Sequence, residues 1–155
     1  MPTLYMLTGV PASGKSTWLS QQPFDWTRTV VISTDNIIDK RAETQGKTYS
    51  EVFQREIKSA TAEMNQNLQY AIAAELDICW DQTNVTAKSR ASKLACVPDS
   101  YEKVAVFFTT PPEAELQRRL SSRPGKTIPW NIVQGMASQL EQPSPAEGFD
   151  RIIVV

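Results

Sequence analysis

Nine consecutive residues near the start of the chain read Gly9-Val10-Pro11-Ala12-Ser13-Gly14-Lys15-Ser16-Thr17. They match the pattern G-x-x-x-x-G-K-[ST], in which the glycines let the backbone wrap around a polyphosphate and turn its N–H groups inward. In this pattern Lys15 places an ammonium group on the β- and γ-phosphates, and the Ser16 hydroxyl is a ligand for Mg²⁺. The stretch therefore predicts binding of a nucleoside triphosphate, with residues 9 and 11–17 as its contacts.

Short apolar segments alternate with segments of helical pattern along the whole chain. The predicted strands are residues 3–7, 30–33, 77–81, 104–108 and 152–155. The predicted helices begin near residue 16 and cover 36–40, 50–72, 87–96, 112–122 and about 130–140, with Ser50 as the N-cap of the longest. This order predicts an α/β fold with a five-stranded parallel sheet flanked by helices, whose ligands bind at the carboxyl ends of the strands.

Length and composition limit the possible functions. The chain has 155 residues, a formal net charge of −1 and no histidine. We expect a single domain over residues 1–155, because this length supports one hydrophobic core. The near-neutral charge provides no general attraction to nucleic acid, so a polynucleotide contact would depend on a local patch. Without histidine, proton transfer would depend on a carboxylate.

The cysteines and the hydropathy indicate a protein of the cytoplasm. Cys79 and Cys96 form no metal-binding pattern, and we expect two buried thiols in a reducing compartment. No apolar run approaches the length of about 18 residues that a membrane span needs. We therefore expect no membrane partner. The sequence does not predict the oligomeric state.

Two aspartates follow predicted strands, where they would face the triphosphate. Asp35 comes after the second strand and is a candidate to accept a proton from an attacking hydroxyl, although it is equally suited to cap the next helix. Asp81 ends the third strand, where it would hold Mg²⁺ through water or simply belong to a polar turn with Thr83 and Asn84.

Basic side chains occur in two further places. Arg119 and Arg123 are four residues apart, just before the Pro124-Gly125 break, and would act from a short lid on the phosphates. The alternative for Arg119 is a surface ion pair with Glu115. A second group forms either a solvated helix face or a small basic patch that contacts substrate. Its members are Lys88, Arg90 and Lys93.

With these residues in place, the chain resembles the P-loop kinases, and among them the phage-type polynucleotide 5′-hydroxyl kinases and the small zeta-toxin-like ATP-binding kinases. The resemblance covers nearly the whole chain. It rests on residues 9–18, Thr34-Asp35, Asp81-Gln82-Thr83-Asn84, Arg119-x-x-x-Arg123 with Pro129, and Pro143-x-x-x-Glu147-Gly148-Phe149-Asp150. It implies a P-loop NTPase fold of the nucleoside- and nucleotide-kinase type, with a short arginine-bearing lid, and a location in the cytoplasm, that of the host if a phage encodes the chain.

The resemblance also implies roles for individual residues. In that family the aspartate that matches Asp35 is the general base, and the residues that match Lys15 and Ser16 serve the phosphates and the metal ion. The arginines that match Arg119 and Arg123 stabilise the transferring phosphoryl group. The implied reaction uses ATP and Mg²⁺ and phosphorylates a hydroxyl group.

Two positions depart from the polynucleotide kinases. Those enzymes have an arginine three residues after the catalytic aspartate, where it contacts a phosphate of the acceptor, and this chain has Ile38 there. Arg41, roughly one turn later, is a possible replacement. Those enzymes also read Asp-Thr-Asn where this chain has Gln82-Thr83-Asn84. Both departures concern the acceptor more than the ATP chemistry.

Three functions therefore remain open. The first is a kinase of a polynucleotide 5′-hydroxyl, the acceptor that the resemblance favours. The second is a kinase of a nucleoside, a small metabolite or a hydroxymethylated base in DNA. The third is an ATP-binding module without catalysis, for which the set of Lys15, Ser16, Asp35, Arg119 and Arg123 would have no use.

Overall fold

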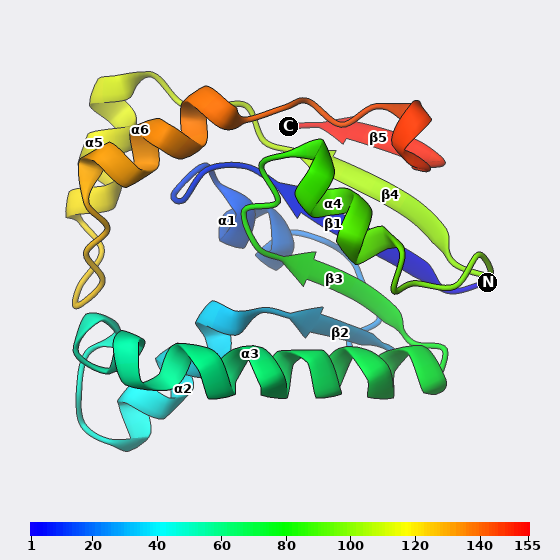
Figure 1. Cartoon of the computed structure of the whole chain (residues 1–155), viewed down its shortest axis with the longest axis horizontal. Coiled ribbons are helices and arrows are strands. Elements are labelled where there is room, and N and C mark those ends of the chain that lie inside the picture. The colour runs from blue at the N-terminus through cyan, green and yellow to red at the C-terminus, as the bar shows by residue number, and fades with distance from the viewer.

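The computed structural model describes all residues from 1 to 155. A five-stranded sheet runs through its centre, formed by β1 (Thr3–Thr8), β2 (Thr29–Ile32), β3 (Asp77–Asp81), β4 (Glu102–Phe107) and β5 (Arg151–Val154). The strand order is β2-β3-β1-β4-β5, and all neighbouring strands are parallel (Figure 1). The predicted parallel sheet is confirmed, and the carboxyl ends of β1, β2 and β3 meet at one edge.

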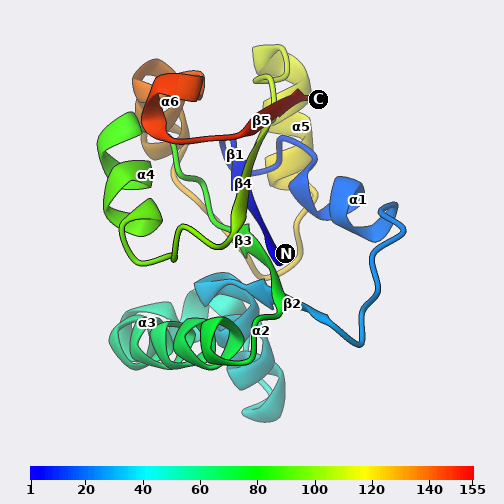
Figure 2. The ribbon, with the colours of Figure 1, turned by 90° about the vertical axis from the view of Figure 1, so that its right-hand side faces the viewer.

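Helices cover both faces of the sheet. They are α1 (Lys15–Ser20), α2 (Thr34–Thr44), α3 (Tyr49–Ala73), α4 (Ala87–Leu94), α5 (Glu113–Ser121) and α6 (Trp130–Gln139), and a 3₁₀ turn follows at Pro145–Glu147. Figure 2 shows α3, α4 and α6 on one side of the sheet, and α1 and α5 on the other. None of these helices is both long enough and apolar enough to cross a membrane.

The alternation of side chains along β1 divides the core between the two faces. On one face of the sheet, the fully buried Leu4 and Met6 belong to the same apolar cluster as Met64 of α3. On the other face, Leu7 belongs to a cluster with Leu19 of α1. Successive residues of a strand point to opposite faces, so a nearly continuous apolar run supplies both halves of the core. The loop that follows β1 is thereby held between two packed layers.

The local structure corrects the predicted start of the longest helix. The N-cap of α3 is Thr48 and not Ser50: its hydroxyl accepts a hydrogen bond from the Glu51 N–H at 3.3 Å, and the Glu51 carboxylate accepts one from the Thr48 N–H at 3.0 Å. This reciprocal pair satisfies two backbone donors at the helix end, which Ser50 could not do. Ser50 lies in the first turn, and its Oγ accepts a bond from the Thr127 N–H.

Two further expectations change for local reasons. The helix predicted over residues 36–40 extends over Thr34–Thr44, because Ser33 caps it and it packs along α3. Cys79 is buried in the core as expected, but Cys96 is exposed just after α4. Burial raises the pKa of the Cys79 thiol to about 12.

The supposed basic patch on α4 is mostly interior. Arg90 is completely buried, and its guanidinium donates to Glu147 at 2.8 and 3.1 Å and to the Asn84 carbonyl at 2.9 Å. Lys93 donates to the Asn84 side chain and lies 5.5 Å from the centre of the Trp80 ring, and burial lowers its pKa to about 8. Only Lys88 is exposed. The sequence pattern alone could not separate a buried arginine from a solvated one, because its partner Glu147 lies far along the chain.

We predict that Glu147→Ala lowers the free energy of unfolding by about 3–5 kcal/mol, because it leaves the buried Arg90 charge without compensation. The matched control is Glu102→Ala, which removes the Glu102–Arg151 pair at 2.7 Å, where 31% and 55% of the two side chains are exposed. An exposed pair contributes under about 1 kcal/mol. Urea denaturation of both variants tests this, and equal losses would show that Arg90 does not depend on Glu147.

Candidate active site

The loop between β1 and α1 needs both glycines of its motif. Gly14 adopts a φ of +106° as the N-cap of α1, in the region that side-chain-bearing residues rarely enter. Gly9 has no such angle, but a Cβ atom there would lie 2.6 Å from Ser13 Oγ and 2.9 Å from Phe108 Cβ. The backbone can therefore form a tight turn whose first residue packs closely against Phe108, just after β4.

Lys15 lies under this loop. Its ammonium donates to the carbonyls of Gly9 at 2.9 Å and Val10 at 2.8 Å. Burial lowers the pKa of Lys15 to about 8, and the nearby Asp81 carboxylate opposes this shift. The cation is thus held in the turn but poorly solvated, which suits it to an anionic ligand.

Four buried side-chain atoms have no hydrogen-bond partner, and two of them are on Thr8 of β1 and Thr29 of β2. The other two, Ser13 Oγ and Arg123 Nη1, belong to residues that border the open space beside the loop. Unpartnered buried donors are unfavourable in a folded protein, so they point to a ligand that accepts hydrogen bonds. Together with the Lys15 ammonium and the glycine turn, they fit a polyphosphate.

The lid arginines approach the loop from α5, which carries Arg119, and from the segment just after it, which carries Arg123. Arg119 donates to the Ala12 carbonyl at 3.2 Å and also forms the expected ion pair with Glu115 at 2.9 Å. Arg118 pairs with the same Glu115 and is largely exposed. The pKa of Glu115 is lowered to about 2 by hydrogen bonds from Arg118 and Arg119.

Asp35 lies in the first turn of α2, immediately after β2. The N-cap of that helix is Ser33, whose Oγ accepts from the Asn36 N–H at 3.2 Å, so the capping alternative for Asp35 is wrong. Its two carboxylate oxygens have different partners: the Tyr49 hydroxyl donates to Oδ1 at 2.7 Å, and the Lys126 ammonium lies 3.3 Å from Oδ2. With 54% of its side chain exposed, Asp35 faces open space.

Asp81 occupies the corresponding position at the end of β3, in register with Leu7 of β1. Burial raises the pKa of its carboxyl group, while Lys15 pulls in the opposite direction. Asp81 and Ser16 line the same cavity. One carboxylate and one hydroxyl suit Mg²⁺, which binds few protein oxygens and takes its other ligands from phosphates and water.

Two adjoining cavities meet at this edge of the sheet. The loop cavity has a volume of about 1000 Å³ and is bordered by residues 11–18 of the loop, the lid arginines and Lys126. The α3–α6 cavity has a volume of about 720 Å³ and lies between these two helices. Asp35 and Asp81 line both cavities, so these carboxylates mark the junction.

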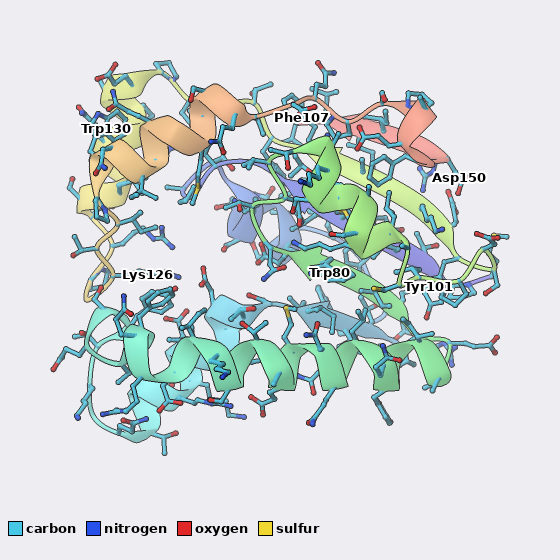
Figure 3. All side chains as sticks on the ribbon, in the orientation of Figure 1. Trp80, Tyr101, Phe107, Lys126, Trp130 and Asp150 are labelled. Atoms are coloured by element: carbon cyan, nitrogen blue, oxygen red, sulfur yellow. The ribbon has the colours of Figure 1, made fainter.

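The structure adds Lys126, which the sequence did not single out, and shows the contacts of Gln82, which the sequence marked only as a departure from the polynucleotide kinases. Lys126 extends from the connection between α5 and α6 into the space above α3 (Figure 3), where its ammonium lies 4.2 Å from the centre of the Tyr49 ring. Gln82 is held by two neighbours, since Trp80 Nε1 donates to its Oε1 and its Nε2 donates to Thr34 Oγ1, both at 3.0 Å. The lid position after Gly125 was the only sequence signal for Lys126.

Other candidates lie outside both cavities. Asn84 is buried, and its Nδ2 donates to the Leu7 carbonyl at 2.7 Å, so it supports the end of β1. Ile38 is fully buried. Arg41 does not replace the missing arginine, because its guanidinium is bound to Glu56 at 2.8 Å and Glu63 at 3.1 Å on α3.

Comparison with known proteins agrees with this geometry. The AAA_33 model of an AAA domain matches residues 4–143. Similar solved structures include the Pnkp1/Rnl/Hen1 RNA repair complex, with 22% identity, a TM-score of 0.69 and coverage of 96% of this chain and 46% of the matched one. The PezAT toxin–antitoxin system of Streptococcus pneumoniae follows at 15% identity, a TM-score of 0.70 and coverage of 99% and 66%.

A third structure, a kinase described as putative from Chloroflexus aurantiacus, has 17% identity, a TM-score of 0.67 and coverage of 99% of this chain and 87% of the matched one. The chain spans less than half the length of the matched chain in the RNA repair complex. At these identities the structural likeness establishes the fold, while the family model covers most of the chain. The chain therefore belongs to this AAA domain family and has the fold of the P-loop kinases.

Proposed function

We propose that this protein is an ATP- and Mg²⁺-dependent kinase that transfers the γ-phosphate of ATP to a hydroxyl group. The observation that carries the proposal is the position of Asp35, whose carboxylate lies where the loop cavity and the α3–α6 cavity meet. A phosphate donor in the first cavity and a hydroxyl in the second would both reach this carboxylate, which is the geometry that in-line transfer needs.

The roles of the other residues follow from their places around the loop cavity. Lys15 and the backbone of residues 9–14 would hold the phosphates, and Ser16 and Asp81 would hold the metal ion. ATP supplies the transferred group, and Mg²⁺ offsets its negative charge. Arg119 and Arg123 approach the loop from the lid, where guanidinium groups would stabilise charge on the phosphoryl group as it moves.

Asp35 can act as a base without losing its present partners. A carboxylate has about four acceptor positions, and Tyr49 and Lys126 use one on each oxygen. During transfer the acceptor oxygen bonds to the γ-phosphorus, the bond from that phosphorus to the β–γ bridging oxygen breaks, ADP leaves, and Asp35 takes the hydroxyl proton.

Two acceptor classes have support. A polynucleotide 5′-hydroxyl is supported by the motif resemblance and by the likeness in fold to the RNA repair complex. A nucleoside, another small metabolite or a hydroxymethylated base is supported by the buried Ile38 and by the engagement of Arg41 with α3. Both classes use the same phosphate chemistry at Asp35.

We predict that Asp35→Asn reduces phosphate transfer by about 10²–10⁴-fold, because an amide cannot accept the proton. ATP binding, followed by calorimetry, should stay within a few fold of the wild type. Transfer is measured with labelled ATP, Mg²⁺ and a panel of 5′-hydroxyl oligonucleotides, nucleosides and small alcohols.

Asp39→Asn is the matched control for this variant. Asp39 lies about one turn later on α2, and its carboxylate is 3.9 Å from the same Lys126, but it lines only the loop cavity. Its loss should change transfer by less than tenfold. Asp35→Asn protein with a near wild-type rate would rule out Asp35 as the base. Wild-type protein that binds ATP yet phosphorylates nothing would identify a non-catalytic module.

We also predict that nucleotide binding takes up protons above pH 8. In the free protein the Lys15 pKa of about 8 means that the ammonium is lost as the pH rises through this value. A bound triphosphate raises that pKa, so the complex holds a proton that the free protein has released, and affinity falls by up to about tenfold per pH unit.

Calorimetry at pH 7.0 and 8.5, in buffers with different ionisation enthalpies, measures the uptake. Lys15→Gln should abolish it. Lys93→Gln should retain it, because Lys93 has a similarly lowered pKa of about 8 but does not line the loop cavity. Proton uptake that is lost in Lys93→Gln but retained in Lys15→Gln would contradict its assignment to Lys15.

A further inference from the structure

The α3–α6 cavity has the dimensions of a small-molecule site. Its volume of about 720 Å³ falls in the range of roughly 300–1000 Å³ that is typical of pockets for small ligands. Phe53 and Ile57 of α3 form one wall, and Ile132 and Met136 of α6 form another. Each pair is spaced four residues apart, so each helix turns one apolar stripe toward the cavity.

The two cavities differ sharply in charge. Every basic side chain at this edge of the sheet lines the loop cavity: Lys15, Arg118, Arg119, Arg123 and Lys126. No lysine or arginine lines the α3–α6 cavity, whose charged groups are the carboxylates Asp35 and Asp81. A phosphate placed in the second cavity would lie beside two carboxylates whose counter-charges, Lys126 and Lys15, line the loop cavity instead, which disfavours it.

Arg41 of α2 and Lys126 of the lid already have partners. Arg41 is bound to Glu56 and Glu63 on α3. The Lys126 ammonium lies between the Asp35 carboxylate and the Tyr49 ring, and it borders only the loop cavity. No guanidinium or ammonium group therefore lines the α3–α6 cavity for a charged acceptor, and Lys58 of α3, which is exposed and has no ion-pair partner, lies outside its lining.

Apart from Asp35 and Asp81, the polar groups of the α3–α6 cavity are neutral and well placed to orient a ligand. Gln82 is held by Trp80 and Thr34, so the remaining proton of its amide and the remaining lone pair of its carbonyl have defined directions. Gln54 and Thr61 add further hydrogen-bonding groups from α3. A few oriented polar groups on apolar walls are the usual means of recognising a small uncharged molecule.

We infer that the phosphate acceptor is an uncharged hydroxyl compound of about nucleoside size with an apolar face, which enters the α3–α6 cavity as a whole. The inference rests on the proposed kinase function and names the acceptor class of that same site. The apolar face packs between α3 and α6, and the hydroxyl lies at Asp35, where it gains the γ-phosphoryl group from ATP and gives its proton to the carboxylate while ADP leaves. A phosphodiester strand is the competing occupant.

The first experiment measures acceptor preference with matched pairs. Nucleosides are compared with their 3′-monophosphates and with 5′-hydroxyl oligonucleotides, and sugars and aromatic alcohols with their monophosphates, in the presence of ATP and Mg²⁺. We expect the uncharged member of a pair to have the higher kcat/KM by at least tenfold. Equal values, or a preference for the charged member or the oligonucleotide, would overturn the inference.

A charge introduced into the cavity should shift this preference. Thr61 is exposed on α3 and lines the cavity, so Thr61→Lys adds a cation there with little risk to folding. We expect the advantage of the uncharged acceptors to fall at least fivefold in Thr61→Lys. Gln66→Lys adds the same charge to an exposed position of α3 outside the cavity and should leave the advantage unchanged. Equal shifts in the two variants would count against the cavity as the acceptor site.

A binding measurement separates this inference from the kinase reaction. With the loop cavity saturated by ADP and Mg²⁺, ligand-observed NMR records which members of the same panel bind. Uncharged members should bind, and Thr61→Trp, which fills the cavity, should abolish their signals while Gln66→Trp should not. Binding that persists without transfer would refute the kinase proposal alone. Absence of binding by every uncharged member, or stronger binding by phosphorylated ones, would refute the acceptor class.

Discussion

The buried contact between Arg90 and Glu147 supports the end of β1, from which the loop over residues 9–14 begins. Arg90 joins the 3₁₀ turn before β5 to the Asn84 carbonyl, and the Asn84 amide in turn holds the Leu7 carbonyl at the end of β1. Next to it, the Gly9 N–H donates to the Thr83 carbonyl at 2.9 Å. One buried ion pair thus ties the last part of the chain to the loop that would receive phosphates. Desolvation of both charges makes such a pair costly to form. Removing one partner destabilises the folded protein more, because it leaves the other charge buried and uncompensated.

At the same edge of the sheet, Lys15 and Lys126 already have partners, which a phosphate ligand would have to displace. Lys15 donates to two carbonyls of its own loop, and Lys126 lies against the Asp35 carboxylate. Each contact stabilises a cation that would otherwise be poorly solvated, yet each competes with a phosphate for the same ammonium group. Binding is therefore an exchange of partners, and its net free energy is smaller than the new contacts alone suggest. The unpartnered Ser13 Oγ and Arg123 Nη1 have no such competition, so they contribute to binding without this penalty.

The parts of the structure that could be predicted from the sequence are those that local patterns determine. The strands, the loop over residues 9–17 and the helix after β2 depend on neighbouring residues, and the predicted positions of Asp35 and Asp81 at the carboxyl ends of β2 and β3 follow from them. The burial of Arg90 depends on Glu147, 57 residues away, and the contact of Lys126 with Asp35 spans 91 residues. The N-cap of α3 was missed for a different reason: two hydroxyl residues lie within reach of the helix start, and only the reciprocal bond to Glu51 decides between Thr48 and Ser50.

Local patterns and contacts between distant residues contribute differently to the two cavities. For this reason the motif resemblance predicts the reaction better than it predicts the acceptor. The part of the loop cavity that would hold phosphates is built from residues 11–18 and the adjoining strand ends, so a short motif carries much of its chemistry, although the lid adds Arg119, Arg123 and Lys126. The α3–α6 cavity is built from two helices that are far apart in sequence, and Phe53, Ile57, Ile132 and Met136 belong to no recognisable motif. At the one acceptor position that the motif does include, the arginine of the polynucleotide kinases is replaced by Ile38, which is fully buried and cannot reach a ligand. Under the proposed function, phosphate chemistry would therefore be retained in this fold while the opposite wall of the site accommodates a different, uncharged acceptor.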